Sequence, residues 1–258
     1  MPPHIRYFAQ SRFEAARRLE RLPRGHPRQG LHGHSFRVAV RGQAPGEPFA
    51  GGEAEALGAA LAQRLTPLRY HLVNETVAQA DDAPLLRWIA RGLAVPEVDG
   101  VSLSGDRRFG VSLDAQGSAH AWRAFRIEAA HRLPHVPEGH KCGRMHGHGF
   151  TVVLYENVDG GDEVDAPERI AGAWAPLEAL LDRACLNDIE GLENPTSEHL
   201  AAWIWRRTEL PALSGVTVTE SATTGCHYEG AEFRIWKQQD FESAVRLEAA
   251  PGSDPRRA

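Results

Sequence analysis

The sequence contains two copies of one pattern, and this repeat restricts the chain to folds built from two similar modules. Residues 13–19 (FEAARRL) match residues 127–133 (IEAAHRL) at an offset of 114 positions, and residues 31–36 (LHGHSF) match residues 145–150 (MHGHGF) at the same offset. Shorter matches at nearly the same offset pair residues 68–74 with 181–187, 85–89 with 200–204, and 100–103 with 215–218. Chance rarely preserves one offset over so many segments. We therefore predict one module over residues 1–117, a second over 118–240, and a disordered polar tail over 241–258.

Each module is expected to contain two strands, two helices and two further strands, in that order. In the second module we predict strands at residues 122–130, 146–157, 215–221 and 231–237, a loop at 223–227, and helices at 167–181 and from residue 195 onward. Thr196 or Ser197 is the expected N-cap of the second helix. This order implies the α+β fold class, with an antiparallel four-stranded sheet and two helices on one face in each module. Joining the open sheet edges of several modules into a barrel would protect those edges.

The composition excludes several classes of protein. The 258 residues carry a formal net charge of −5, so there is no basic field for nucleic acid. No apolar run is long enough to span a membrane, and the first ten residues lack the apolar core of a signal peptide. The three cysteines, Cys142, Cys185 and Cys226, are too few for a disulfide framework. A cytoplasmic protein with reduced thiols is the simplest interpretation.

Three histidines in the second module have the arrangement of a metal site. His146 and His148 are two residues apart, so on a strand both side chains point to the same face. His131, on the neighbouring predicted strand, completes a cluster of three imidazoles, and three protein ligands with an open fourth position are typical of catalytic zinc. Cys142, four residues before His146, is a candidate acid, base or nucleophile beside the metal. The alternatives are histidines that only make hydrogen bonds in the sheet and a cysteine that is buried as a small apolar residue.

These residues belong to a set of motifs that extends over nearly the whole second module. The motifs are residues 129–133 (AAHRL), 142–148 (CGRMHGH), 181–187 (LDRACLN), 194–198 (NPTSE) and 219–226 (TESATTGC). Together they make the module resemble the 6-pyruvoyl-tetrahydropterin synthase family. The short spacing between Cys142 and His146 resembles the 6-carboxytetrahydropterin synthase branch of that family, which serves the synthesis of queuosine and other deazapurines.

The resemblance implies a fold, a reaction and a set of site residues. The fold is the tunnelling fold (T-fold), whose modules join edges into barrels, so a homo-oligomer of two or three chains is expected. The reaction is a lyase reaction that releases acetaldehyde and triphosphate from 7,8-dihydroneopterin triphosphate. The residues that the resemblance assigns are His131, His146 and His148 as ligands of Zn²⁺, Cys142 as the base, Glu220 as the anchor of the pterin ring, Asp182 as part of a proton relay, and Thr196 and Cys226 as further contacts to the substrate.

The chain departs from the family pattern at Arg183, because the family has a histidine after the aspartate and this chain has Asp182-Arg183. An arginine stays protonated at working pH, so Arg183 cannot replace that histidine in a proton relay. Arg183 can still bind triphosphate or stabilise a developing oxyanion, and it stays a candidate catalytic residue. Two alternatives therefore remain open: a pterin- or purine-binding protein without turnover, and an altered reaction on a related heterocycle. Asp182 can equally be a surface charge at a helix end.

The first module lacks most of these site residues. At the positions of the first histidine ligand, the cysteine, the Asp-His pair and the glutamate it has Arg17, Arg28, Arg69-Tyr70 and Gly105, and it retains His32 and His34. We expect neither zinc nor catalysis in this module. If modules of the two kinds alternate around a barrel, Arg17, Arg28, Arg69 and Arg183 are expected to form a phosphate-binding wall.

Overall fold

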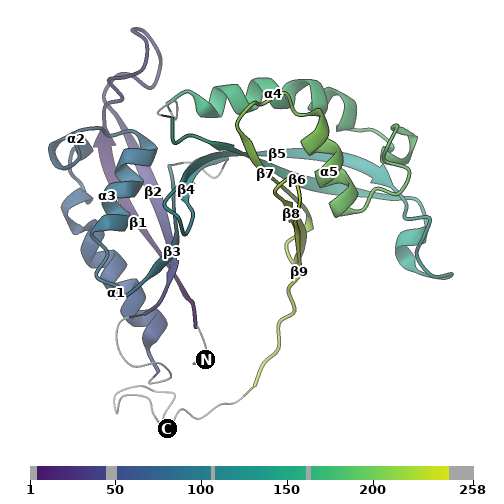
Figure 1. Ribbon diagram of the computed structural model, residues 1–258, viewed down its shortest axis with the longest axis horizontal. Helices are drawn as coiled ribbons and strands as arrows, with labels where there is room; N and C mark the ends of the chain where they lie inside the picture. Colours follow the sequence, from purple (N-terminus) through teal and green to yellow (C-terminus); the bar gives the residue numbers. More distant parts are fainter. Residues whose placement is uncertain (1–4, 45–50, 106–107, 161–163, 244–258) are drawn as a thin grey trace. The chain divides into compact units, whose positions relative to one another are not determined.

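The computed structural model describes residues 5–44, 51–105, 108–160 and 164–243. The chain divides into two compact units, one built from residues up to His120 and the other from residues between Ala121 and Asp240 (Figure 1). Each unit is a mixed α/β structure with an antiparallel sheet, as predicted. The predicted tail lies mainly outside the described residues, and residues 241–243 form neither helix nor strand. Among the described residues no helix is long and apolar enough to cross a membrane.

The first unit has four strands in the order β1-β2-β3-β4, each antiparallel to its neighbour. The strands are β1 (Tyr7–Arg17), β2 (His32–Gly42), β3 (Val98–Ser104) and β4 (Phe109–Leu113). The helices between β2 and β3 are α1 (Glu53–Leu65), the 3₁₀ turn η1 (Thr66–Leu68), α2 (Val73–Thr76) and α3 (Asp82–Arg91).

The core of the first unit lies between its sheet and its helices (Figure 1). Strand alternation places Phe13 and Phe36 opposite each other, fully buried, with stacked rings whose centroids are 4.8 Å apart. In α1, Leu57, Leu61 and Leu65 recur every four residues, so they form one buried face toward β1. Full burial of each such side chain stabilises the fold by about 1.5–3 kcal/mol.

The second unit follows the same order of elements and adds one strand at the end. Its elements are β5 (Ala119–His131), the 3₁₀ turn η2 (Lys141–Gly143), β6 (His146–Asn157), α4 (Ala166–Leu181), the 3₁₀ turn η3 (Leu186–Asp188), α5 (Ser197–Arg207), β7 (Leu213–Ser221), β8 (Thr224–Tyr228) and β9 (Phe233–Lys237). The strands lie in the order β5-β6-β7-β8-β9. Both helices pack against the sheet, α4 on β6 and α5 on β7 and β8 (Figure 1).

Two buried tryptophans anchor these helices. Trp174 of α4 is buried and stacks on Phe125 with ring centroids 5.0 Å apart. Trp203 of α5 is buried and its indole N–H donates to the carbonyl of Glu190 at 2.9 Å. The hydrogen bond satisfies the one polar atom of the Trp203 ring, so the large apolar surface is buried without an unpaired donor.

The predicted loop at residues 223–227 is wrong, because strand β8 occupies it. Residues Thr224–Tyr228 pair with β7 on one side and β9 on the other. The Thr-Thr-Gly sequence indicated a turn, but the chain reverses over Ala222 and Thr223 alone, so the strand starts earlier. The second unit consequently has five strands where four were predicted, and Cys226 lies inside a strand.

Candidate functional site

The three histidines meet at the end of the second unit's first two strands. His131 is the last residue of β5, and His146 and His148 begin β6, the neighbouring strand. One ligand atom from each side chain lies within 4.8 Å of the other two. His131 is only 1% exposed, and the other two are half-buried. Within the part of the chain that the structure describes, this is the one group of three or more His, Cys, Asp or Glu side chains close enough to hold a metal ion.

Backbone carbonyls set the tautomers of these rings. The Nδ1 atoms of His131 and His146 contact the carbonyl oxygens of Pro195 (3.2 Å) and Arg144 (2.8 Å), and Nδ1 of His148 contacts the carbonyl of the next residue (3.3 Å). A carbonyl oxygen only accepts hydrogen bonds, so each Nδ1 carries the proton and donates. The lone pair of each neutral ring is therefore on Nε2.

The Nε2 atoms of His131 and His148 are 3.1 Å apart. Two lone pairs at that distance repel unless a cation or a proton lies between them. Two imidazole nitrogens on one tetrahedral zinc ion, with bonds of about 2.0–2.1 Å, lie roughly 3.3 Å apart, so this spacing fits a metal ion. Burial lowers the pKa of His131, outweighing the opposing effects of the Pro195 carbonyl and of Glu220, and this favours the neutral ring that metal binding requires.

Cys142 lies in η2, in the loop between β5 and β6, and is half-buried. Its backbone is held at two points. Its N–H donates to Nδ1 of His140 at 3.2 Å, and its carbonyl accepts from the N–H of Leu133 at 2.8 Å. Because Leu133 is two residues after His131, the second bond ties the Cys142 loop to the strand end that holds the first histidine.

Glu220 lies near the end of β7, where its Oε1 accepts a hydrogen bond of 2.8 Å from the Ser197 hydroxyl. Ser197 is the first residue of α5, and Thr196 before it caps the helix by accepting from the N–H of His199. The pairing of Ser197 with Glu220 was not predicted; the sequence signal was the serine of the NPTSE motif, which we had interpreted only as a cap. Glu220 also raises the pKa of His131, so the carboxylate acts electrostatically on the histidine cluster.

Cys226 is fully buried in β8 and pairs across the sheet with Val218. Burial, with a smaller contribution from Glu198, raises the pKa of its thiol to about 11. The prediction that placed Cys226 in a loop is corrected here. A protonated, fully buried thiol can affect a ligand only through packing.

Asp182 and Arg183 follow α4 and lie beside β5. The Oδ1 of Asp182 accepts from the N–H of Glu128 at 2.9 Å, so this carboxylate joins the helix end to the strand. Arg183 donates its own N–H to the Glu128 carbonyl, while its side chain is 87% exposed.

Asn187 makes a similar connection to β5 that was not predicted. Its side chain accepts from the N–H of Arg132 at 2.8 Å and donates to the Arg132 carbonyl at 2.9 Å.

At the three positions that correspond to the histidine cluster, the first unit has His32, His34 and Arg17. Arg17 ends β1 and is 1% exposed, paired with Asp82. Arg17 therefore cannot contribute to a phosphate-binding wall, and that prediction is corrected for this residue. Arg69 donates to the Ser11 hydroxyl at 3.1 Å.

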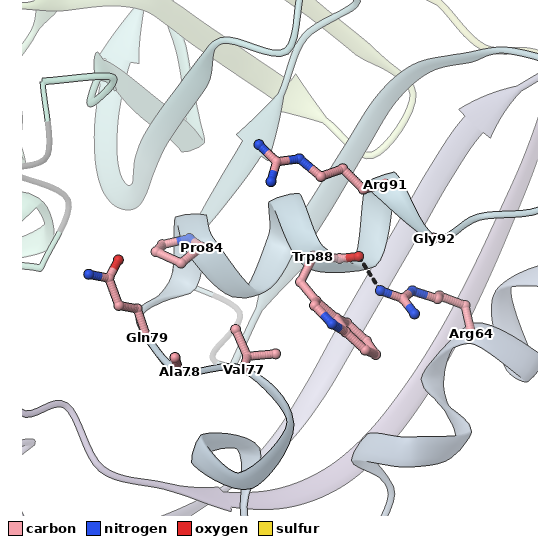
Figure 2. Close-up of a pocket in the computed structure, with 8 residues that line it drawn as sticks. All are labelled: Arg64, Val77, Ala78, Gln79, Pro84, Trp88, Arg91 and Gly92. Carbon is pink, nitrogen blue, oxygen red and sulfur yellow. Dashed lines mark hydrogen bonds between the residues drawn. The ribbon is translucent and has the colours of Figure 1, made fainter.

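Two hollows are lined by residues of the first unit. Figure 2 shows one of about 510 Å³, lined by Arg64, Val77, Ala78, Gln79, Pro84, Trp88, Arg91 and Gly92. In it the Arg64 guanidinium lies over the Trp88 ring and donates to the Trp88 carbonyl (Figure 2). The other, of about 550 Å³, is lined by Glu14, Ala15, Ala16, Gly33, His34, Ser35, Tyr70, His71 and Leu72.

The fold and the site define a class: a mixed α/β protein whose antiparallel sheet carries a three-histidine cluster at the end of two neighbouring strands. The model of the 6-pyruvoyl tetrahydropterin synthase family matches residues 120–231. The 6-carboxy-5,6,7,8-tetrahydropterin synthase of Synechocystis sp. is 41% identical over 118 residues, which cover 42% of this chain and 90% of that protein. The chain belongs to the 6-pyruvoyl tetrahydropterin synthase family.

Solved structures also show likenesses. The 6-pyruvoyl tetrahydropterin synthase of Caenorhabditis elegans is 21% identical with a TM-score of 0.39, covering 43% of this chain and 95% of that one. A uricase from Arthrobacter globiformis is 8% identical with a TM-score of 0.39, covering 92% of this chain and 96% of that one. Family membership rests on the sequence matches.

Proposed function

We propose that the second unit is a zinc-dependent lyase of the 6-carboxytetrahydropterin synthase type, acting on 7,8-dihydroneopterin triphosphate and releasing acetaldehyde and triphosphate. The observation that carries this proposal is that the rings of His131, His146 and His148 converge. Each ring donates a hydrogen bond from Nδ1 to a backbone carbonyl, which leaves its Nε2 lone pair for a metal ion. The 41% identity to a 6-carboxytetrahydropterin synthase supports the reaction type.

The three histidines would hold the metal through Nε2. A bound zinc ion would supply Lewis acidity, which lowers the proton affinity of the oxygens on the substrate side chain. The carbonyls of Pro195 and Arg144 orient two of the ligand rings, a type of outer contact that commonly fixes metal-binding histidines.

Glu220 would bind the N–H groups of the pterin ring. A carboxylate accepts from two donors at once, which suits the paired N–H groups of a pterin. The Ser197 hydroxyl holds one carboxylate oxygen at 2.8 Å and so limits the rotation of Glu220. Thr196 and Cys226 would shape this end of the pocket, Thr196 from the start of α5 and Cys226 from within the core.

Cys142 would accept the proton from the substrate side chain. Asp182 is committed to the N–H of Glu128, which supports a positioning role. Arg183 is permanently charged and exposed, so it would bind the triphosphate and could not shuttle protons.

A second candidate function is a pterin- or purine-binding protein without turnover. The observation that favours it is Arg183 itself, since a guanidinium stands where the family's relay histidine is expected.

We further propose that both units are T-fold modules, the first a degenerate copy over residues 1–117 and the second over 118–240. The shared order of strands and helices supports this. The terminal strands of the units, β1 and β9, are candidate edges for a homo-oligomeric barrel. The three free cysteines support a reducing, cytoplasmic location.

The test is to incubate the zinc-loaded protein with 7,8-dihydroneopterin triphosphate and to separate the products by mass-resolved chromatography. Formation of 6-carboxytetrahydropterin, abolished in Cys142→Ala and His148→Ala, is the expected result. Bound but unchanged substrate would favour the binding protein. Neither binding nor conversion would reject both functions.

A further inference from the structure

The first unit contains a buried cation at the end of β1. Arg17 is 1% exposed, and an uncompensated charge at such a position is costly. Its guanidinium has three polar partners: Asp82 Oδ1 at 2.5 Å, the Ala80 carbonyl at 3.1 Å and His34 Nε2 at 3.3 Å. Asp82 neutralises the charge, and the other two atoms accept further N–H groups.

The contact with His34 determines the state of that ring. A guanidinium can only donate, so Nε2 of His34 must present its lone pair. Burial, followed by the charge of Arg17, lowers the pKa of His34 to about 4, so the ring is neutral near pH 7. A hydrogen bond with the backbone of Gly105 acts in the opposite direction on the pKa of this ring. A neutral imidazole with a free Nε2 lone pair is also what a metal ion would require.

The surroundings of Arg17 correspond to those of His131. Each residue is the last of the first strand in its unit. Arg17 donates to the carbonyl of Ala80, directly before the N-cap of α3, and His131 donates to the carbonyl of Pro195, directly before the N-cap of α5. Each side chain also approaches Nε2 of the third residue of the next strand, at 3.3 Å for His34 and at 3.1 Å for His148.

The second retained histidine agrees with this correspondence. His32 donates from Nδ1 to the Gly30 carbonyl at 2.7 Å, just as His146 does to the Arg144 carbonyl at 2.8 Å. His32 Nε2 is buried and, among the described residues, has no hydrogen-bond partner. This nitrogen is therefore an unused lone pair on the β2 residue that pairs with Arg17 in the sheet register.

We infer that the Arg17 guanidinium takes, in the first unit, the cation position that a metal ion takes in the second, so that the chain holds one divalent ion and one internal arginine cation in two versions of the same site. This inference rests on the proposed metal site of the second unit. Asp82 stands where the second unit has Ser197, and its negative charge compensates the permanent charge of the arginine. The first unit is thereby stabilised by a cation that neither chelators nor metal limitation can remove.

If the inference is correct, two substitutions should convert the Arg17 position of the first unit into a metal-binding site. Arg17→His with Asp82→Ser would restore a third imidazole near the Ala80 carbonyl and remove the compensating carboxylate. Arg17→Lys with Asp82 retained keeps a buried cation and is the matched control.

The experiment measures bound Co²⁺ per full-length chain, by elemental analysis after gel filtration and by the visible absorption of the protein-bound ion. We expect one ion in the natural protein, none in His148→Ala, one in His34→Ala, two in the Arg17→His, Asp82→Ser variant, and one in Arg17→Lys. Circular dichroism establishes that each variant is folded.

Two results would overturn the inference: two ions in the natural protein with one lost in His34→Ala, or a folded double variant that still binds one ion. If the double variant fails to fold, the natural protein and His34→Ala decide the question alone. Absence of any ion in the natural protein would reject the proposed metal site of the second unit. In that case, the gain of one ion in the double variant would still support the inference that Arg17 occupies the cation position in the first unit.

Discussion

Tyr70 and Arg183 have the same unusual backbone conformation at corresponding places in the two units. Their φ angles are 58° and 61°, and they are the non-glycine residues with positive φ in the described parts of the chain. Tyr70 donates its N–H to the carbonyl of Glu14 at 2.7 Å, and Arg183 donates to the carbonyl of Glu128 at 2.5 Å. The residue with positive φ thus attaches the chain to the first strand in each unit, and this backbone hydrogen bond holds a conformation that these side chains disfavour.

We predict that Arg183→Asn stabilises the protein. Asparagine tolerates positive φ better than arginine, and the exposed contact of Arg183 with Asp182 (3.7 Å) is worth little. The expected gain is about 0.5–1 kcal/mol, or roughly 1–4 °C in Tm, measured by thermal unfolding without substrate. Arg183→Ala, which leaves the strain in place, is the control. Equal Tm values for the two variants would contradict the explanation by backbone strain.

Asn187 and Asn74 allow a matched test of how the proposed metal site is supported. Asn187 bridges the N–H and the carbonyl of Arg132, the residue after His131, and Asn74 makes the same bridge to Arg18 in the first unit. We predict that either substitution to Ala lowers the free energy of unfolding by about 0.5–1.5 kcal/mol, because each removes the side-chain hydrogen bonds to the backbone of an exposed arginine. Only Asn187→Ala should also weaken Co²⁺ binding, measured by titration of the visible absorption. Equal metal affinities in the two variants would show that the bridge does not position His131.

The sequence was sufficient to predict features that depend on neighbouring residues, such as the face of a strand on which a side chain lies and the N-cap of a helix. Strand alternation places His146 and His148 on one face, as the structure shows. The NPTSE motif predicts an N-cap at Thr196 or Ser197, and the structure has the cap at Thr196. These features depend on residues close together in the chain, so spacing alone can predict them.

What the sequence could not predict depends on contacts between distant segments. We predicted Arg17 as part of a phosphate-binding wall, but the side chain is buried and its charge is neutralised by Asp82, 65 residues away in the sequence. The strand β8 was missed because its pairing with β9 outweighs the turn preference of Thr-Thr-Gly. The conformation of Arg183 is set by a hydrogen bond to Glu128 that has no sequence signature.

His34 should make stability depend on pH. Its pKa is about 4 in the folded protein and about 6.5 in the unfolded chain, with burial as the main cause and Arg17 next. Between these values the unfolded state binds a proton that the native state does not, so stability falls as the pH drops from about 6.5 to about 4. We expect a loss of about 1–2 kcal/mol from this half-buried ring, after allowance for solvent screening. Urea unfolding at several pH values gives the free energy of unfolding as a function of pH. Between pH 4 and about 6.5 this free energy should change less steeply with pH in His34→Gln than in the natural protein. Equal pH dependence in the two proteins would contradict the assignment.

The adjacent residues Ser197 and Thr196 should separate pocket geometry from helix stability. Ser197 holds Glu220 by a hydrogen bond of 2.8 Å, whereas the Thr196 hydroxyl accepts from the N–H of His199 at the start of α5. We predict that Ser197→Ala weakens the binding of neopterin, an oxidised pterin, by about 5–10-fold, because Glu220 loses the donor that fixes its orientation. Thr196→Ala, whatever its effect on the pocket, should lower the free energy of unfolding by about 1 kcal/mol through the loss of the N-cap, and Ser197→Ala should not. Fluorescence titration with neopterin and urea unfolding of both variants provide the two measurements, and Co²⁺ binding should stay unchanged in each. If Ser197→Ala leaves neopterin affinity intact while Glu220→Gln abolishes it, Glu220 is positioned by the sheet alone and the hydroxyl contact has no part in recognition.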